Sequence, residues 1–157
     1  MLTVVTGPPC GGKTYWVMER ATASDIVIDF DRLAVALSGP GADEHTHSKD
    51  LRDVTFRARA GAITAALQLA RTATVYLIHT QPNAAAWQRY TEAGATVVTI
   101  DPGRATVEQR ARLERPPATL AIIGKWYAAR AQVQAEATPP PAPVAAPAGP
   151  AITSRSW

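Results

Sequence analysis

Eight residues near the start of the chain have the types and spacing of a phosphate-binding loop. They follow the apolar run Leu2–Thr6 and fit the pattern G-x-x-x-x-G-K-[ST]: Gly7, Pro8, Pro9, Cys10, Gly11, Gly12, Lys13 and Thr14. In such a loop the glycines let successive backbone N–H groups point at phosphate oxygens, and the following helix adds its positive dipole end. We expect Lys13 to reach the β- and γ-phosphates of ATP and the Thr14 hydroxyl to ligate Mg²⁺. The loop therefore predicts ATP and Mg²⁺ as cofactors.

Two carboxylates follow the next predicted strand, residues 25–29. Asp29 and Asp31 lie two positions apart where the backbone turns, so their side chains are expected to diverge. Phosphoryl transfer to a hydroxyl needs a carboxylate that accepts the hydroxyl's proton. We assign that catalytic role to Asp31 and a place in the metal's surroundings to Asp29. The alternative for Asp31 is that it caps the helix beginning at Arg32, and the two roles are compatible.

Four arginines, mixed with Glu108 and Glu114, form a third group: Arg104, Arg110, Arg112 and Arg115. A kinase needs cations that close over the transferring phosphoryl group, where charge spreads over three oxygens, and a lid that excludes water. We expect Arg110 to be the catalytic cation and Arg104 to lie on the adenine side. The alternative is an exposed helix with i,i+4 pairs, such as Glu108 with Arg112.

Short β-branched runs alternate with longer helical segments, and this alternation must position the three groups. Strands are predicted at residues 2–6, 25–29, 73–79 and 95–100, and helices at 13–23, 31–37, 50–71, 83–93, 106–115 and 118–134. The alternation predicts an α/β fold of the P-loop NTPase, nucleoside-kinase-like type, with a mostly parallel sheet of four to five strands flanked by helices. Ligands of such sheets bind beyond the carboxyl ends of the strands, where residues 29–31, 79–81 and 101–104 join the loop.

The order of these parts resembles the P-loop kinase group that includes phage polynucleotide kinase, zeta-toxins and chloramphenicol phosphotransferases. The resemblance covers about residues 1–117 and implies that Lys13 and Thr14 hold phosphate and metal, that Asp31 is the general base, and that a lid arginine acts on the phosphoryl group. The chain departs from that group at three places. Ala34 stands where an acceptor-binding Arg is expected, His79-Thr80 ends the third strand where an Asp is common, and Cys10 replaces a Gly.

The net charge of +3 is concentrated in residues 49–71, which carry five cations and two anions. A basic helix beside a nucleotide site suits an anionic acceptor such as nucleic acid, and the alternative is a solvated helix face that is rich in arginine. His45 and His47, in the loop before this helix, are interpreted either as contacts to the acceptor or as metal ligands.

The folded domain is expected at residues 1–134, with a disordered Pro/Ala-rich tail at 135–157 that is either inert or docks a protein partner. One cysteine and no membrane segment predict a cytoplasmic protein, and assembly into a homo-oligomer is left open. The expected function is ATP-dependent transfer of the γ-phosphate to a hydroxyl of a nucleic acid 5′ end, a nucleotide or a modified base. Two alternatives remain, a small-molecule kinase and a non-catalytic ATP-binding module that recruits a partner through its tail.

Overall fold

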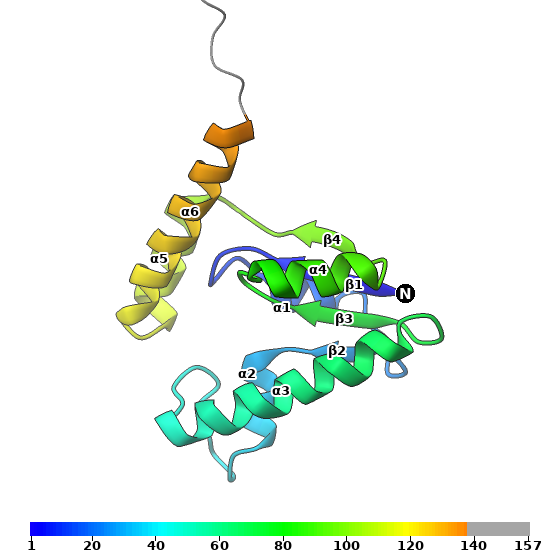
Figure 1. Ribbon diagram of the computed structural model, residues 1–157. Coiled ribbons are helices and arrows are strands. Elements are labelled where there is room, and N and C mark those ends of the chain that lie inside the picture. The colour runs from blue at the N-terminus through cyan, green and yellow to red at the C-terminus, as the bar shows by residue number, and fades with distance from the viewer. Residues whose placement is uncertain (138–157) are drawn as a thin grey trace, which may run out of the picture.

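A parallel four-stranded sheet forms the body of the protein. The computed structural model describes residues 1–137, and side chains up to residue 133. The strands are β1 (Leu2–Thr6), β2 (Ile26–Ile28), β3 (Val75–Ile78) and β4 (Thr96–Thr99), in the order β2-β3-β1-β4. Every neighbouring pair is parallel, with Val4 opposite Leu77 and Val97. The carboxyl ends of all the strands therefore lie at one edge of the sheet (Figure 1).

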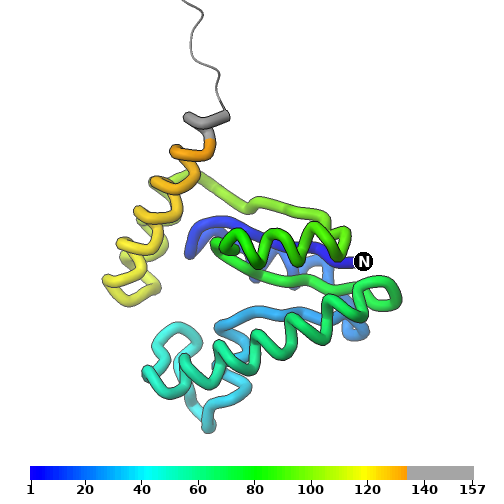
Figure 2. Tube along the Cα trace, viewed as in Figure 1, coloured from blue at the N-terminus to red at the C-terminus, as the bar shows by residue number. Residues whose placement is uncertain are grey.

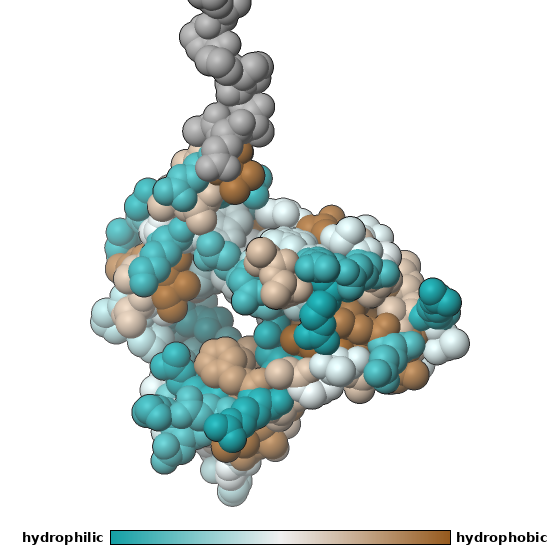
Figure 3. Space-filling model, viewed as in Figure 1, coloured by the Kyte–Doolittle hydropathy of each residue, from teal (hydrophilic) through white to brown (hydrophobic). Residues whose placement is uncertain are grey.

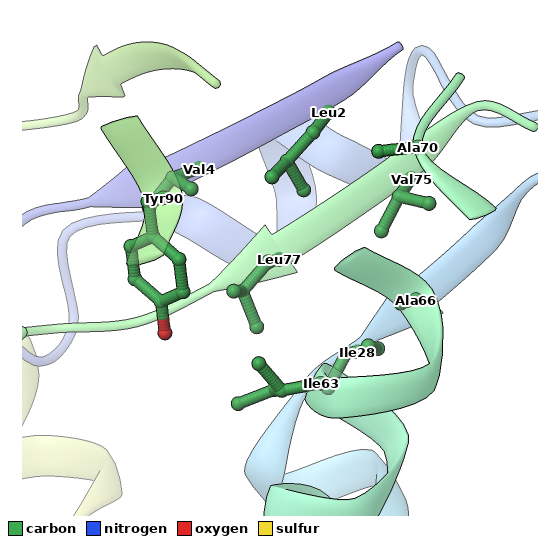
Figure 4. Packing of buried hydrophobic residues seen from close by; sticks show 9 residues of the cluster. All are labelled: Leu2, Val4, Ile28, Ile63, Ala66, Ala70, Val75, Leu77 and Tyr90. Carbon is green, nitrogen blue, oxygen red and sulfur yellow. The ribbon is translucent and has the colours of Figure 1, made fainter. Parts of the chain in front are cut away.

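Helices cover both faces of the sheet. They are α1 (Lys13–Met18), α2 (Phe30–Ala36), α3 (Lys49–Leu69), α4 (Ala84–Glu92), α5 (Arg104–Glu114) and α6 (Ala118–Ala137). Because side chains alternate along a strand, β1 and β3 bury residues on both sides. Leu2, Val4, Val75 and Leu77 pack against α3 and α4, through residues such as Ile63 and Tyr90 (Figure 4). The residues that alternate with these along the two strands point to the other face. Among them, Val5, Tyr76 and Ile78 pack against Val17 of α1.

Helices α5 and α6 form an antiparallel hairpin that stands beside the carboxyl ends of the strands (Figures 1 and 2). The hairpin has a small core of its own, made of Val107, Ala111 and Ile123, and Cys10 of the β1–α1 loop packs against it. Trp126 attaches α6 to the body, since its indole N–H donates to the Thr80 carbonyl oxygen at 3.1 Å. The hairpin thus faces the strand ends from outside the sheet.

The predicted α/β class with a parallel sheet is confirmed, and several element boundaries differ. Helix α1 ends at Met18 rather than at residue 23, and α5 begins at Arg104 rather than at 106. Helix α6 continues to Ala137, past the expected domain boundary at residue 134. The expected tail lies outside the described residues from position 138 on. Within residues 1–137, no helix combines the length and the apolar character needed to cross a membrane.

Candidate functional site

The loop between β1 and α1 is wrapped tightly and depends on its glycines. Gly7 has φ +138°, and a Cβ there would lie 2.1 Å from the carbonyl oxygen of Ile100, at the end of β4. Gly12 has φ +91° and caps α1. Cys10 has φ +59°, a conformation that is uncommon for a residue with a side chain. The loop is therefore pressed against the sheet, and its conformation follows from residues that tolerate positive φ.

Lys13 lies under this loop. Its side chain is buried, and its ammonium donates to the carbonyl oxygens of Gly7 at 3.0 Å and Pro8 at 2.6 Å. Burial lowers the pKa of Lys13 to about 8, an effect that the negative charge of Asp29 partly opposes. The ammonium is held against its own loop, where a bound phosphate would compete for it.

Asp29 connects the loop to the end of β2. The Thr14 hydroxyl donates to one Asp29 carboxylate oxygen at 2.6 Å, and the other accepts from the backbone N–H of Asp31 at 3.2 Å. Asp29, which is buried, is thus the N-cap of α2. The alternative interpretation, in which Asp31 caps this helix, is wrong, because α2 begins at Phe30, two residues before Arg32. The structure does bring together Thr14 and Asp29, the two residues predicted to surround the metal.

Asp31 lies in the first turn of α2, beside one arginine and two histidines. The Arg115 guanidinium donates to its carboxylate at 3.1 Å. His45 Nδ1 lies 3.6 Å and His47 Nε2 lies 3.8 Å from the same carboxylate. The two histidines are thus near the predicted base but do not line the cavity, and their role as acceptor contacts stays a prediction. Their interpretation as metal ligands gains no support, since the described part of the chain holds no group of three or more His, Cys, Asp or Glu side chains able to bind a metal.

A cavity of about 660 Å³ joins these residues at the strand ends. Pro9, Cys10, Gly11, Gly12, Lys13 and Thr14 line one wall, Asp29 and Asp31 another, and Arg110 and Arg115 the wall formed by α5. Gly7 and Pro8, the first two residues of the loop, do not line the cavity, and their carbonyl oxygens accept hydrogen bonds from the Lys13 ammonium. Figure 3 shows that this face of the molecule is hollowed between the α5–α6 hairpin and the ends of α2 and α3.

The arginines of α5 do not all reach this cavity. Arg110 does, and its guanidinium donates to the Cys10 carbonyl oxygen at 3.2 Å. Arg104 does not line it, although it was expected on the adenine side: it pairs with Glu108 at 2.7 Å and lies over the Tyr127 ring. Arg112 also pairs with Glu108, at 3.4 Å, as the alternative interpretation of this helix predicted.

Sequence reasoning gave no individual role to several polar and aromatic residues of the cavity, among them Arg115, Arg59, Phe56 and Phe30. Arg115 belonged to the arginine-rich segment, but nothing local showed that it, rather than Arg112, would meet Asp31. Arg59 and Phe56 come from the basic stretch on α3, three positions apart and so on one helix face. Phe30 directly follows Asp29. The spacing of Phe56 and Arg59 was the available signal, because an aromatic residue and a cation on one face suit a nucleotide.

The comparisons with known proteins bear on the fold. No family model and no curated protein matches the chain. A solved structure, "Structure of the Pnkp1/Rnl/Hen1 RNA repair complex", contains a chain that superposes with a TM-score of 0.59 at 13% sequence identity. The match covers 88% of this chain and 46% of the other, so this chain spans about half the length of its structural neighbour. At that identity the likeness concerns the fold alone.

The residues present fit a nucleoside triphosphate with Mg²⁺. The loop needs glycine at positions 7 and 11 to wrap tightly against the end of β4, because a Cβ at either would lie within 3 Å of the Ile100 carbonyl oxygen. Lys13 is a cation whose acceptors are loop carbonyls, and the Thr14 hydroxyl is paired with a buried carboxylate, as a residue in the surroundings of Mg²⁺ would be. Mg²⁺ takes only one or two protein ligands beside phosphates and water, so the small number of carboxylates is compatible with it.

Proposed function

We propose that this chain is a P-loop kinase that uses ATP and Mg²⁺ to phosphorylate a hydroxyl of a nucleic acid 5′ end, a nucleotide or a modified base. The observation that carries the proposal is the cavity at the strand ends. It holds a glycine-rich loop with Lys13 and Thr14 on one wall, the carboxylate of Asp31 on another, and arginines of α5 on a third. This is the set of groups that phosphoryl transfer requires.

In this proposal the glycine-rich loop and Lys13 bind the β- and γ-phosphates, and Thr14 with Asp29 surrounds Mg²⁺. The metal, when bound, neutralises charge on the phosphates. Lys13 gives up its contacts to the Gly7 and Pro8 carbonyls in exchange for phosphate oxygens. Because a bound anion stabilises the charged ammonium, the pKa of Lys13 rises when ATP binds.

Asp31 accepts the proton of the acceptor hydroxyl as that oxygen forms its bond to the γ-phosphorus. The bond between the γ-phosphorus and the β–γ bridging oxygen breaks, and ADP leaves. Arg115 holds the Asp31 carboxylate at 3.1 Å and so positions it, while Arg110, at the Cys10 carbonyl, lies where it can reach the transferring group. Arg110 lies in α5 and Arg115 directly follows this helix, so the placement of α5 affects both donor and acceptor.

The fold comparison supports the same proposal. The structural neighbour comes from an RNA repair complex that includes Pnkp1, and the matched chain shares the arrangement of this body. Nucleic acid is consequently the first acceptor to test. Cytoplasmic location and a protein partner for residues 135–157 are further parts of the proposal.

The test is transfer of label from [γ-³²P]ATP to 5′-hydroxyl oligonucleotides, nucleosides, nucleotides, hydroxymethylated DNA and simple sugars. Wild-type protein is expected to label an oligonucleotide or a nucleotide. Asp31→Asn should abolish labelling while ATP affinity stays within about twofold, because Asn keeps the shape and loses the basic oxygen. Asp53→Asn, an exposed carboxylate on α3 that pairs with Lys49, is the matched control. Full turnover by Asp31→Asn would remove Asp31 from the role of base.

A non-catalytic ATP-binding module is the second candidate, and one observation favours it. β3 is followed by His79 and Thr80, so no carboxylate follows it where phosphoryl-transfer enzymes of this fold often place a metal-side acid. Burial and the charge of Arg59 lower the pKa of His79 to about 4, so this side chain is neutral and adds no charge for a metal. ATP binding with no labelled product across the whole panel would establish the module.

A further inference from the structure

Arg59 is a buried cation that the proposed mechanism does not use. It extends from α3 to the carboxyl end of β3, is 9% exposed, and lines the cavity. One of its N–H groups donates to the Ile78 carbonyl oxygen at 2.7 Å, and its Nε has no partner among the described residues. A guanidinium has five N–H donors, so most of the donors of Arg59 have no acceptor among the described residues.

No carboxylate in the described part of the chain forms an ion pair with Arg59. Burying a charge is unfavourable unless an anion or hydrogen bonds compensate, and here burial lowers the pKa of Arg59 below its ordinary value. The neighbouring His79 does not compensate either, since it is neutral and its Nδ1 meets the Tyr90 hydroxyl at 2.9 Å. A buried guanidinium that has unpaired N–H donors and no carboxylate partner, and that lies at a cavity wall, is suited to binding an anion.

Arg59 lies on the acceptor side of the cavity. Lys13 belongs to α1, on one face of the sheet, and Arg59 reaches the strand ends from α3, on the other. The negative charge of Asp29 raises the pKa of both cations, so its carboxylate is near each of them. Arg59 therefore shares its side of the cavity with α2 and the start of α3 rather than with the glycine-rich loop.

Two aromatic rings lie next to it. Phe56, three positions before Arg59 on α3, is 53% exposed, and its ring centroid lies 4.7 Å from that of Phe30 at a tilt of 44°. Both rings line the cavity. An exposed aromatic face beside a guanidinium is the combination that receives a base and the phosphate attached to its sugar.

We propose that Arg59 binds a phosphate group of the acceptor while Phe56, supported by Phe30, receives the acceptor's base, so that the acceptor is a nucleotide or nucleic acid rather than a free nucleoside. This inference rests on the proposed function for the identity of the second substrate. It assigns selection of a phosphorylated acceptor to a residue of α3, on the opposite side of the sheet from the triphosphate site.

The test compares binding and transfer for thymidine, thymidine 3′-monophosphate, thymidine 5′-monophosphate and a 5′-hydroxyl oligonucleotide. Binding is measured by calorimetry in the presence of a non-hydrolysable ATP analogue, so that it does not depend on turnover. Wild-type protein should bind at least one phosphorylated ligand roughly ten- to a hundredfold more tightly than thymidine, the range of a charge-assisted pair. The two monophosphates show which position of the phosphate the site accepts.

Arg59→Met should remove this preference and leave the affinity for the ATP analogue unchanged. Arg57→Met, an exposed arginine on the same helix, makes the same change of charge outside the cavity and should bind like wild type. Arg59→Lys keeps a cation for the buried position if the Met variant fails to fold, and should retain part of the preference. Phe56→Leu should weaken the binding of thymidine and of its two monophosphates by the same factor, because the variant loses the ring that receives the base.

Two results overturn the inference. One is equal binding of thymidine and its monophosphates by wild type, and the other is loss of ATP-analogue affinity in the Arg59 variants, which would place Arg59 in the triphosphate site. The kinase proposal fails separately: a phosphate preference that depends on Arg59, with no transfer to any acceptor, supports the anion site and refutes the kinase. Transfer to the phosphorylated acceptors that is as fast in the Arg59→Met variant as in wild type supports the kinase and refutes the anion site.

Discussion

Replacing Lys13 with Met should make the nucleotide-free protein more stable and unable to bind ATP. The pKa of Lys13 is lowered from its ordinary value of 10.5 to about 8, chiefly by burial. At about 1.4 kcal/mol per pH unit, keeping this ammonium charged in the folded protein at pH 7 costs about 3 kcal/mol. Met removes that cost, together with two hydrogen bonds to the Gly7 and Pro8 carbonyls worth about 1 kcal/mol each. The net expectation is a gain of about 1 kcal/mol, or roughly 4 °C in Tm.

The pH dependence gives the same prediction an independent readout. The folded pKa lies below the unfolded one, so the unfolded chain binds more protons between pH 8 and pH 10.5, and wild-type stability rises through that window. Relative to Lys13→Met, wild type should recover about 2 kcal/mol between pH 7 and pH 9.5. Groups that titrate in both proteins cancel in this difference.

Chemical denaturation with and without Mg·ATP is the assay. ATP at a hundredfold excess over its Kd should stabilise wild type by about 2.7 kcal/mol and leave Lys13→Met unchanged, so that the order of stability inverts. Lys125→Met, an exposed lysine on α6, controls for the loss of a positive charge. A Lys13→Met protein that is less stable than wild type at pH 7 without nucleotide, or a stability difference that does not change with pH, would refute this account of the buried ammonium.

Three further predictions concern the loop, the end of β3 and the hairpin. Gly7→Ala places a Cβ 2.1 Å from the Ile100 carbonyl oxygen at φ +138° and should destabilise the fold by more than about 3 kcal/mol in a denaturant titration, whereas Gly61→Ala, in open space on α3, should stabilise it by about 1 kcal/mol. The pKa of His79 lies at about 4, below its ordinary 6.5, so wild type should lose about 2 kcal/mol of stability as the pH falls from 7 to 4.5, and His79→Gln should lack this loss; identical acid profiles would contradict it. Arg115→Met should slow phosphoryl transfer roughly a hundredfold, and Arg112→Met should leave the rate unchanged; equal rates in the two variants would show that the contact to Asp31 has no role in transfer.

Local signals in the sequence predicted most of the fold. The β-branched runs and their spacing indicated the four strands. Asn83 stands at the start of the helix predicted at residues 83–93, and its side chain caps α4 by accepting from the Ala86 N–H at 2.9 Å. The Glu108–Arg112 pair was also foreseen. These features depend on neighbours within a few positions, where helix and strand periodicity determines which side chains meet.

Contacts between distant segments could not be predicted in this way. Arg115 and Asp31 are separated by 84 positions, and their contact depends on how the α5–α6 hairpin sits against the strand ends. Arg104 illustrates the same limit: its position after β4 suggested the nucleotide site, but α5 begins at Arg104 itself, which turns the side chain toward Glu108 and Tyr127. Each residue of a helix turns by about 100°, so an error of two residues in the predicted start of a helix changes the expected direction of a side chain by more than half a turn. An error in the predicted boundary therefore leads to a wrong prediction of which side chains reach the site.

Asp29 is the residue in which these long-range relations meet. Its two oxygens are committed to Thr14 and to the Asp31 N–H, so one buried carboxylate fixes the position of the predicted metal-side hydroxyl relative to the predicted base. Its charge also raises the pKa values of Lys13 and Arg59 against the effect of burial. In the proposed kinase, this carboxylate at the end of β2 supplies the negative charge that is absent after β3, and it is near two buried cations. In the proposed kinase, this arrangement separates the triphosphate on the α1 side from the acceptor's phosphate on the α3 side, which is the division that transfer between two phosphate-bearing substrates requires.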